Sequence, residues 1–513
     1  MAAAPPLEQQ PDVVAFLGEG TAFGGETPRR IDTHAAYVFL TRDRAWKLKR
    51  AVRFPYLDFS TPELRREAFE AEFALNRRAA PELYLAVRPI TRAPDGSLAI
   101  DGAGEPIDWV LEMRRFPDEA LMTEVARAGG LHAGLTRQLA DTIVAFHRKA
   151  GPVEARGSLL VEKIIAGNEA SFREVSSILD PAQVAALTTA QRRELAAHAG
   201  QLDNRGRAGR VRHGHGDLHL ANIALIDGEP VLFDCIEFSS ELATVDILYD
   251  LAFLLMDLWY RGLKTQANQI ANRYLDIAPQ GASGYTLLPL FISVRAAIRA
   301  HVRAAASLNG GGETVAEEAR SYLALAGQVL EPAQTELLAV GGLSGTGKST
   351  VAAILGARLG RAPGARVLRS DVFRKRLAGV PPETRLPARS YTKRANAETY
   401  TALFESANDH LLFGTSVVLD AVFGSRSERD VAESLGTRDR VPFTGLWLEA
   451  PEADRLARVH ERTGDASDAT WKVVHEQSRR SVGELAHWHR MKANRPLEAI
   501  IAAARGVLER HRH

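Results

Sequence analysis

The spacing of hydrophobic positions predicts a β-rich lobe at the start of the chain. Residues 1–30 are rich in Pro and Gly, and we expect a loose extension with one short helix there. AAYVFL and AWKLKR then alternate apolar and polar positions around the polar turn TRDR, the pattern of two paired strands. PELRREAFEAEFALNRRAA repeats apolar residues at helical spacing. LAVRPI, SLAID and DWVLEMRRF follow as predicted strands.

The hydrophobic pattern changes twice further along the chain. Residues 118–210 are predicted to be mostly helical, and helices continue to about 330 with a glycine loop in ASLNGGGETV. EPAQ, at 331–334, indicates a linker. After it, the strands ELLAV, RVLRSD, SVVLDAVF and FTGLWLEA alternate with helical stretches, which predicts an α/β domain with a parallel sheet. We therefore expect an extension over 1–30, an α+β domain over 31–330 and an α/β domain over 335–513.

The composition is that of a globular protein and disfavours several classes. The 513 residues exceed what one hydrophobic core usually organises. Lys and Arg total 64 against 63 Asp and Glu, and this net charge of +1 disfavours nucleic acid as a partner. Cys235 is the only cysteine, which excludes an intramolecular disulfide and a four-cysteine zinc site.

We expect a cytoplasmic protein that does not cross a membrane. The first residues lack the basic segment that precedes the apolar run of a signal peptide. The most apolar stretch, ILYDLAFLLMDLW, is too short to span a bilayer and is interrupted by Asp250 and Asp257. The oligomeric state is left open by the sequence.

GLSGTGKS, residues 342–349, matches the phosphate-binding P-loop pattern G-x-x-x-x-G-K-[ST]. A predicted strand precedes the motif and a predicted helix follows it, which is the context that a P-loop requires. Its glycines let backbone N–H groups surround phosphates, Lys348 reaches the β- and γ-phosphates, and Ser349 can bind Mg²⁺. The nucleotide-binding residues expected here are Gly342, Ser344, Gly345, Thr346, Gly347, Lys348, Ser349 and Thr350.

Two aspartates lie where strands of the second domain are predicted to end. Ligands of open parallel sheets bind beyond the carboxyl ends of the strands. Asp420, closing SVVLD, therefore suits a contact with the metal through water, and Asp371, closing RVLRSD, suits a general base or an orienting group for an acceptor hydroxyl. Either could instead cap a helix. Arg455, Arg458 and Arg462 on a later helix are candidates for a lid over the phosphates, or for a solvated charged face.

Residues 335–500 resemble the small P-loop kinases, the group that contains gluconate kinases and polynucleotide 5′-hydroxyl kinases. GLSGTGKST, RSDVFRK, VVLDAVF and the arginine-rich segment ending in DASDAT carry the resemblance. It implies phosphoryl transfer to a small acceptor, with Asp371 and Arg374 near that acceptor.

HGHGDLHLANI, residues 213–223, allows two interpretations. H-x-H-x-D-x-H is close to a binuclear zinc motif, but Leu218 shifts the spacing by one, and no histidine follows His219 until His301. The kinase catalytic loop, H-x-D-x-x-x-x-N, is matched in full by His215, Asp217 and Asn222. We favour the kinase interpretation.

The metal site of a kinase needs a second oxygen ligand near Asn222. NIALI and EPVLFD flank Asp227-Gly228, a turn pair typical of β-hairpins. Such a hairpin returns Asp234 toward Asn222, so the two residues are predicted to hold Mg²⁺ on ATP while Asp217 acts on the acceptor hydroxyl.

The predicted small lobe contains candidates for the remaining parts of an ATP site. Lys47 and Lys49 are two apart on a predicted strand and share one face. We expect Lys47 to hold the α- and β-phosphates and to pair with Glu72; Lys49 and Glu70 are the alternatives. Met113 is expected near the adenine, with a structural core position as the alternative reading.

Residues 30–330 resemble the aminoglycoside phosphotransferase-like branch of the protein-kinase fold. HGDLHLANI, FDCIEF and VDILYDLAF carry the resemblance. It implies a catalytic role for Asp217, metal binding by Asn222 and Asp234, and a structural role for Asp250. The glycine-rich phosphate loop of kinases is replaced by DTHAAYVFL, in which Thr33 or His34 is a candidate substitute. The order of the two domains resembles a bacterial two-domain family.

The predicted function is a bifunctional ATP-dependent phosphotransferase that uses ATP and Mg²⁺ at two sites. Its partners are small-molecule hydroxyl acceptors, whose identity the fold does not fix. Two alternatives remain. One is a kinase-like domain regulated by a P-loop ATPase switch. The other is a polynucleotide 5′-hydroxyl kinase in the C-terminal domain, and the net charge disfavours this second alternative.

Overall fold

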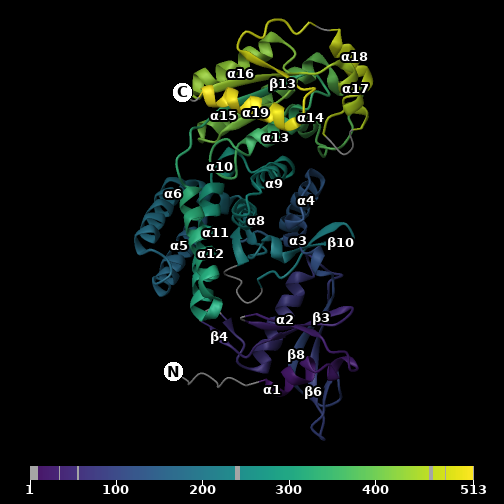
Figure 1. Ribbon diagram of the computed structural model, residues 1–513, viewed down its shortest axis with the longest axis vertical. Helices are drawn as coiled ribbons and strands as arrows, with labels where there is room; N and C mark the ends of the chain where they lie inside the picture. The colour runs from purple at the N-terminus through teal and green to yellow at the C-terminus, as the bar shows by residue number, and fades with distance from the viewer. Residues whose placement is uncertain are drawn as a thin grey trace. The chain divides into compact units, whose positions relative to one another are not determined.

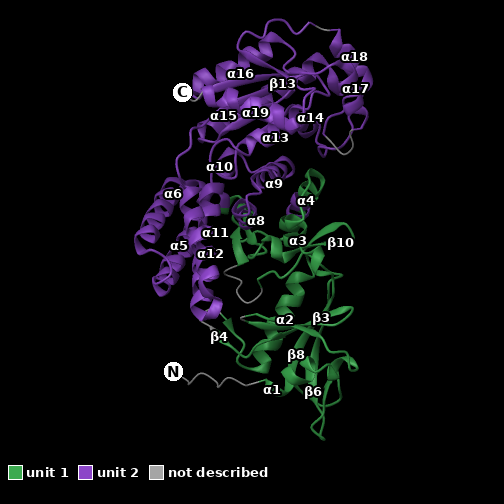
Figure 2. Cartoon of the chain, in the orientation of Figure 1, with its two compact units in different colours: residues 1–138, 145–155, 206–251 green, residues 139–144, 156–205, 252–513 purple. Residues whose placement is uncertain are grey.

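The computed structural model describes residues 10–33, 35–54, 57–236, 243–461, 466–479 and 481–511. The chain divides into two compact units (Figure 2). Unit 1 comprises residues 1–138, 145–155 and 206–251, and unit 2 comprises residues 139–144, 156–205 and 252–513. The linker predicted at 331–334 contains no helix or strand and lies within unit 2.

Unit 1 contains a six-stranded antiparallel sheet in the order β1-β2-β3-β8-β6-β7. The strands are β1 Arg29–Asp32, β2 Ala36–Leu40, β3 Arg44–Lys49, β6 Tyr84–Arg92, β7 Leu98–Ile100 and β8 Glu105–Arg114. The accompanying elements are α1 Pro11–Gly18, η1 Thr21–Phe23, β4 Arg53–Phe54, β5 Leu57–Asp58 and α2 Pro62–Asn76. The β-rich lobe with one central helix is therefore present as predicted.

Strand alternation decides which side chains of the sheet meet α2. Val110 of β8 joins the core beneath α1, whereas the next residue, Leu111, joins the core around Phe69 of α2. On β3, Leu48 likewise packs in the α1 core. Because successive strand residues face opposite sides, Lys47 and Lys49 lie on the α2 side. Figure 1 shows α2 against the sheet that contains β3 and β8.

The rest of unit 1 carries the motif HGHGDLHLANI. The elements are η2 Asp118–Ala120, α3 Met122–Arg127, β9 Val211–His213, η3 Leu220–Asn222, β10 Ile223–Ile226, β11 Glu229–Leu232 and β12 Thr244–Asp246. β10 and β11 form the predicted hairpin, with Asp227 and Gly228 at φ 53° and 84° in its turn. A type I′ turn requires positive φ at both central residues, and the pair Asp-Gly suits this geometry. Three helices continue from one unit into the other: α4 Ala133–Lys149, α6 Pro181–Arg207 and α8 Ile247–Tyr260.

Unit 2 joins helices from the first half of the chain to the whole P-loop half. The helices before the linker are α5 Gly157–Glu174, α9 Lys264–Ile277, α10 Ala282–Tyr285, α11 Leu288–Ala306 and α12 Gly312–Gln328. The predicted glycine loop between α11 and α12 is the kinked segment η4 Ser307–Gly311, in which Asn309 and Gly310 leave helical geometry and Gly310 has φ 101°.

The P-loop half is built on a five-stranded parallel sheet in the order β14-β15-β13-β16-β17. The strands are β13 Leu337–Gly342, β14 Arg366–Arg369, β15 Val417–Asp420, β16 Phe443–Glu449 and β17 Trp488–Lys492. The helical elements are α13 Lys348–Gly356, α14 Ser370–Leu377, η5 Ala388–Tyr391, α15 Lys393–Leu412, α16 Arg426–Asp439, α17 Glu452–His460, α18 Trp471–Ser478 and α19 Leu497–His511. Helices cover both faces, because Leu338 and Val340 enter one core while Leu337 and Ala339 enter the other.

The outer edge of β14 is covered by α9. Asn272 Oδ1 accepts the backbone N–H of Val367 at 2.8 Å and a guanidinium N–H of Arg366 at 2.7 Å. Asn268 Nδ2 donates to the carbonyl of Ala365 at 2.8 Å. A helix encoded before the linker therefore satisfies hydrogen-bonding groups that a sheet edge would otherwise expose.

Two sequence interpretations of strand ends need correction. Asp371 does not close a strand: β14 ends at Arg369, and Asp371 lies in the first turn of α14. β17 was not predicted as a strand, although Trp488 and Met491 bury apolar surface in the two cores of the sheet.

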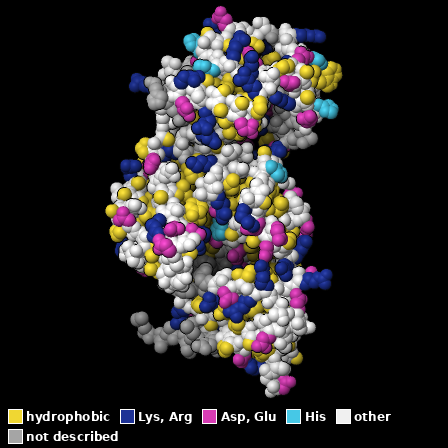
Figure 3. All heavy atoms as spheres, in the orientation of Figure 1, with side chains coloured by type: hydrophobic (Ala, Val, Ile, Leu, Met, Phe, Trp, Pro, Cys, Tyr) yellow, Lys and Arg dark blue, Asp and Glu magenta, His cyan; other side chains and the backbone are white. Residues whose placement is uncertain are grey.

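The surface seen in Figure 3 mixes positive and negative side chains without one large area of a single sign. This distribution agrees with the net charge of +1. Among the residues that the structure describes, no helix combines the length and apolar composition needed to span a bilayer.

Candidate functional site

The catalytic-loop motif in unit 1 is held by a buried carboxylate. Asp250, on α8, accepts the backbone N–H groups of His215 at 2.7 Å and Gly216 at 2.8 Å. His147 Nε2 lies 3.0 Å from the same carboxylate. A side chain at Gly216 would meet Ile236, and its φ of 81° also favours glycine. These contacts agree with the structural role expected for Asp250, because they fix the turn that precedes Asp217.

Asp217 and Asn222 face each other across the loop. Asn222 Nδ2 donates to the Asp217 carboxylate at 2.9 Å and to its backbone carbonyl at 3.0 Å. His219 Nε2 lies 3.4 Å from the same carboxylate. The Asp217 side chain remains one-third exposed, so it can be reached by an acceptor. The Asn222 nitrogen thus orients the Asp217 carboxylate, and the Asn222 amide oxygen is the atom expected to bind metal.

The hairpin brings Asp234 back to the loop, as the sequence predicted. The backbone N–H of Phe233 donates to the carbonyl of Asn222 at 3.0 Å. Asp234 adopts φ 60°, a conformation uncommon outside glycine, and its N–H donates to the buried hydroxyl of Tyr84 at 2.9 Å. Asn76 accepts the next backbone N–H, that of Cys235, at 2.8 Å. These contacts fix the backbone at Asp234, and its carboxylate lies 2.8 Å from Lys47 Nζ.

Lys47 connects the small lobe to the metal-ligand position. Its Nζ lies 2.7 Å from Glu72 and 2.8 Å from Asp234. Lys49 binds the other oxygen of Glu72 at 2.7 Å. Burial raises the pKa of the Glu72 carboxyl, but the charges of Lys47 and Lys49 outweigh burial and hold that pKa below its usual range. Glu70, the alternative partner, is exposed and pairs with Arg66 instead.

The other small-lobe candidates have less distinctive positions. Met113 lies opposite Ala45 of β3 and packs at the margin of the α2 core. Thr33 closes the turn between β1 and β2 by bonding Ala36 through its backbone and hydroxyl. His34, the other substitute for the phosphate loop, lies outside the described residues.

The three histidines of the motif lie in different surroundings. His213 Nδ1 contacts the hydroxyl of Thr244 at 3.2 Å, and His219 contacts Asp217. His215 is fully buried, burial lowers its pKa, and neither ring nitrogen has a hydrogen-bond partner within the described part of the chain. Such rings do not form a shared ligand set. The oxygens of Asn222 and Asp234, by contrast, are the ligand type that Mg²⁺ prefers.

The P-loop of unit 2 has the predicted strand–loop–helix setting. Gly342 has φ 139°, and a Cβ there would approach the carbonyl of Leu448 to 2.5 Å, so only glycine fits. Gly345 and Gly347 also have positive φ. Lys348 Nζ donates to the carbonyl of Leu343 at 3.2 Å, within the loop that it is expected to complete around phosphates. Thr350 lies exposed on the first turn of α13.

The two oxygens expected to bind metal in unit 2 lie on either side of an arginine. Asp420 ends β15 as predicted, and Arg369 ends the neighbouring β14 in register with it. Arg369 Nη2 donates to Ser349 Oγ at 3.2 Å, and its Nε donates to Asp420 at 3.3 Å. A hydroxyl and a carboxylate are suitable Mg²⁺ ligands.

Asp371 and Arg374 lie one helical turn apart at the start of α14. Burial raises the pKa of the Asp371 carboxyl, the nearby charge of Arg369 opposes this rise, and the charge of Asp420 adds to it. Arg374 donates to the carbonyl of Ser390 at 3.0 Å and to Asn396 at 2.6 Å. A raised pKa suits a carboxyl that must accept a proton.

Two of the three arginines of the predicted lid lie within the described residues, and their contacts differ. Arg458 donates to the carbonyls of Gly345 in the P-loop, at 3.4 Å, and Ala493, at 2.8 Å. Arg455 is buried and donates to Ser478, which makes it a structural residue of α17. Arg462 lies outside the described residues.

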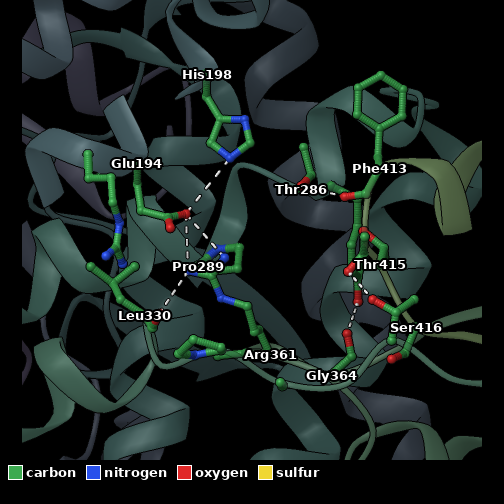
Figure 4. Close-up of a pocket in the computed structure, with 17 residues that line it drawn as sticks. Glu194, His198, Thr286, Pro289, Leu330, Arg361, Gly364, Phe413, Thr415 and Ser416 are labelled. Carbon is green, nitrogen blue, oxygen red and sulfur yellow. Dashed lines mark hydrogen bonds and ion pairs between the residues drawn. The ribbon is translucent and has the colours of Figure 1, made fainter. Parts of the chain in front are cut away.

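A cavity of about 400 Å³ in unit 2 lies apart from both motifs. Figure 4 shows Glu194 between His198 and Arg361, with Thr286 and Phe413 on the other side. None of the predicted catalytic or nucleotide-binding residues lines it. We therefore do not assign it to either phosphotransfer site.

Several side chains in the two sites carried no clear sequence signal. Tyr84 and Asn76 act through the backbone of residues 234 and 235, more than a hundred positions away. Gln477 of α18 accepts the N–H of Ser344 in the P-loop at 2.8 Å. Arg369 is the exception, because it opens the quoted RSDVFRK segment and its position at a strand end could have been noticed.

Comparisons with known proteins cover nearly the whole chain. The family described as "Phosphotransferase enzyme family" matches residues 33–285, and the one described as "AAA domain" matches residues 337–483. The protein Rv2004c of Mycobacterium tuberculosis and the protein Mb2027c of Mycobacterium bovis are each 30% identical over 503 residues, which cover 92% of this chain and 94% of each relative. These matches agree with the predicted fold class, a kinase-like α+β domain followed by an α/β P-loop domain.

Solved structures show likeness to parts of the chain. A choline kinase from Cryptosporidium parvum is 10% identical and covers 62% of this chain and 94% of its own, with a TM-score of 0.40. An aminoglycoside phosphotransferase from Streptomyces rimosus is 18% identical and covers 55% and 98%, with a TM-score of 0.34. A gluconokinase from Sinorhizobium meliloti is 20% identical and covers 35% and 94%, with a TM-score of 0.26.

Proposed function

Because the chain belongs to the family of two-domain proteins that join a phosphotransferase domain to a P-loop kinase domain, we propose that it phosphorylates two acceptors at two separate sites. Both domains are of kinase type, so the enzyme is an ATP-dependent phosphotransferase. The observation that supports the two-site proposal is that each half brings a separate charged cluster together: Lys47 with Asp234 beside the Asp217–Asn222 pair in unit 1, and Arg369 with Ser349 and Asp420 beside the P-loop in unit 2. ATP as donor is compatible with the cytoplasmic location expected from the sequence.

At the first site, Asp217 orients the acceptor hydroxyl and takes its proton. The acceptor oxygen forms a bond to the γ-phosphorus, the bond from that phosphorus to the bridging oxygen breaks, and the electron pair leaves on ADP. Lys47 holds phosphate oxygens, and Asn222 and Asp234 would hold Mg²⁺. The metal supplies positive charge that offsets the charge on the phosphates. The ion pair of Lys47 with Glu72, at 2.7 Å, keeps the lysine in place.

At the second site, the P-loop from Gly342 to Ser349 surrounds the phosphates, with Lys348 on the β- and γ-phosphates. Ser349 and Asp420 would hold Mg²⁺. Asp371 takes the proton of the second acceptor, and Arg374 and Arg458 are the cationic groups on either side. Positioning and charge neutralisation account for catalysis at both sites.

The test is a phosphate-transfer screen of a metabolite library with the full-length chain. Asp217→Ala is expected to abolish one phosphorylated product and Lys348→Ala a different one. Matched controls are the exposed residues Asp43 and Lys393, whose alanine variants are expected to retain both products. If Asp217→Ala leaves every product intact, unit 1 holds no phosphotransferase site of the proposed kind. If both variants lose the same product, the two sites are not independent.

A P-loop switch that regulates the first domain is the second candidate, and one contact favours it. Arg273 of α9 binds Asp141 of α4 at 2.7 Å and Glu383, in the segment after α14, at 2.6 Å. These ion pairs join the segment after α14 to two helices encoded before the linker. Acceptor-independent ATP hydrolysis that Lys348→Ala abolishes, together with altered first-site activity, would favour the switch. The full chain is required, because α9 covers the edge of β14.

A polynucleotide 5′-hydroxyl kinase remains the third candidate. Transfer of phosphate to a 5′-hydroxyl oligonucleotide would support it, and binding would then weaken steeply with salt. The mixed charges in Figure 3 provide no basic track for a nucleic acid on that face.

A further inference from the structure

Arg369 lies between the two oxygens assigned to the metal of the second site. It is the last residue of β14, paired in register with Asp420 at the end of β15. Its guanidinium donates to Ser349 Oγ at 3.2 Å and to Asp420 Oδ2 at 3.3 Å. The strand ends thus place a fixed positive charge where the P-loop chemistry requires one.

The same charge also reaches the acceptor side of the site. Burial is the main influence on the Asp371 carboxyl and raises its pKa, and Arg369 is the strongest opposing influence. Arg369 contacts the oxygens assigned to the metal and stands two residues before the proposed base, at the junction of β14 and α14. The transferring phosphoryl group must pass between these two positions.

Mg²⁺ bound to Ser349 Oγ would repel a guanidinium that lies 3.2 Å from the same oxygen, because both groups are cations. Arginine keeps its charge at any physiological pH and donates several hydrogen bonds in one plane, a geometry that matches phosphate oxygens. When nucleotide and metal enter, the guanidinium must leave Ser349. Anionic phosphate oxygens are then the partners within reach of a side chain anchored at the strand end.

We propose that Arg369 is a catalytic residue of the second site, which bridges Ser349 and Asp420 before nucleotide binds and contacts the transferring γ-phosphoryl group afterwards. The inference rests on the proposed function of that site. During transfer, the acceptor oxygen bonds to the γ-phosphorus, the bond to the bridging oxygen breaks, and the electron pair leaves on ADP. The acceptor proton goes to Asp371, and Arg369 donates hydrogen bonds to the non-bridging oxygens throughout.

The test compares triphosphate with diphosphate binding in the full-length chain. A non-hydrolysable ATP analogue and ADP are titrated in Mg²⁺ and in EDTA, and the signal that Lys348→Ala removes is assigned to the second site. Arg369→Met is expected to weaken analogue binding by about 10- to 100-fold, the effect of losing a charge-assisted contact. The effect is expected to be greatest in EDTA, where no metal neutralises the γ-phosphate, and ADP affinity should change by less than about threefold.

The controls separate a phosphate contact from a structural role. Arg358→Met, on the exposed surface after α13, is expected to bind both nucleotides like the wild type. Arg369→Lys keeps a charge and is expected to fall between wild type and Arg369→Met. If Arg369→Met fails to fold, Arg369→Gln removes the charge while retaining a donor to Asp420.

Two outcomes overturn the proposal. One is an unchanged ratio of analogue to ADP affinity in a folded, uncharged Arg369 variant. The other is a folded Arg369→Lys that binds the analogue no better than Arg369→Met. The nucleotide ratio is independent of any acceptor. If the wild type transfers no phosphate but Arg369→Met changes the ratio of analogue to ADP affinity, the proposed function is wrong and the proposed contact of Arg369 with the γ-phosphate is supported.

Discussion

The two proposed ATP sites are built in opposite ways. In the first, the charged groups are already joined: the buried carboxylate of Glu72 holds Lys47 and Lys49, and Lys47 also holds Asp234. In the second, side chains occupy groups that a nucleotide is expected to use. Arg369 binds Ser349, and Gln477 binds an N–H of the P-loop.

The difference follows from how each site is encoded. The first site joins residues that are 25 and 187 positions apart in sequence, through a buried ion pair of Lys47 with Glu72 and a more exposed ion pair of Lys47 with Asp234. The second site takes its phosphate loop from one contiguous segment, whose glycines fix the backbone without side-chain contacts. We therefore expect mutations in the first site to cost stability and mutations in the second to change ligand binding.

The largest effect is expected from Glu72→Gln. The change leaves the buried ammonium of Lys49 without its carboxylate, and breaking a buried pair in this way costs about 3–5 kcal/mol. Denaturant unfolding followed by fluorescence measures the loss, and first-site activity should fall with it. Glu70→Gln, an exposed neighbour on the same helix, is expected to cost about 0–0.5 kcal/mol. Equal unfolding midpoints for the two variants would show that the ion network does not support unit 1.

A loss of similar size is expected from Asp250→Ala. The variant leaves the backbone N–H groups of His215 and Gly216 buried without their acceptor, at a cost of about 1–3 kcal/mol for a buried donor. Because these groups set the turn before Asp217, first-site turnover should fall by more than about tenfold. The second product should be unaffected. First-site turnover equal to wild type would mean that the turn holds without Asp250.

Sequence reasoning succeeded where one local pattern determines one local structure. The P-loop is a contiguous string, and the Asp-Gly turn of the hairpin brought Asp234 to Asn222 as expected. The alternation along β3 placed Lys47 and Lys49 on one face, and Glu72 is their common partner. Such inferences need only the periodicity of a strand or the conformational preference of a turn.

It failed where a contact depends on packing between distant segments. No pattern around Tyr84 or Asn76 indicates that they bond the backbone at 234 and 235. β14 ends two residues before Asp371, and the sequence does not reveal this because the boundary between β14 and α14 has no glycine or proline to mark it. The covering of β14 by α9 depends on Asn268 and Asn272, which on the sequence are ordinary polar helix residues.

The pH dependence of the second site follows from the Asp371 carboxyl. Its pKa is raised chiefly by burial, so second-site activity should fall on acidification at a pH above the ordinary aspartate value of 3.8. A raised carboxyl pKa favours the folded state below the unfolded pKa, and that contribution is lost as pH rises through the folded pKa. Asp371→Asn should therefore abolish transfer yet raise the unfolding temperature at neutral pH. This gain in unfolding temperature should vanish at low pH. If the gain is the same at every pH, it does not arise from the ionisation of Asp371.

The smallest effect tests whether the second site is held by replaceable contacts. Gln477 Oε1 accepts the N–H of Ser344, one neutral hydrogen bond at the edge of the P-loop. If nucleotide must displace it, Gln477→Ala should raise second-site affinity for ADP by about two- to tenfold, the net worth of such a bond. The neighbouring exposed Glu476→Ala should leave the affinity unchanged, and titrations with the Lys348→Ala protein define which signal belongs to the site. A lower affinity in Gln477→Ala would make Gln477 a nucleotide contact, and the second site would then resemble the first in having its binding groups already in place.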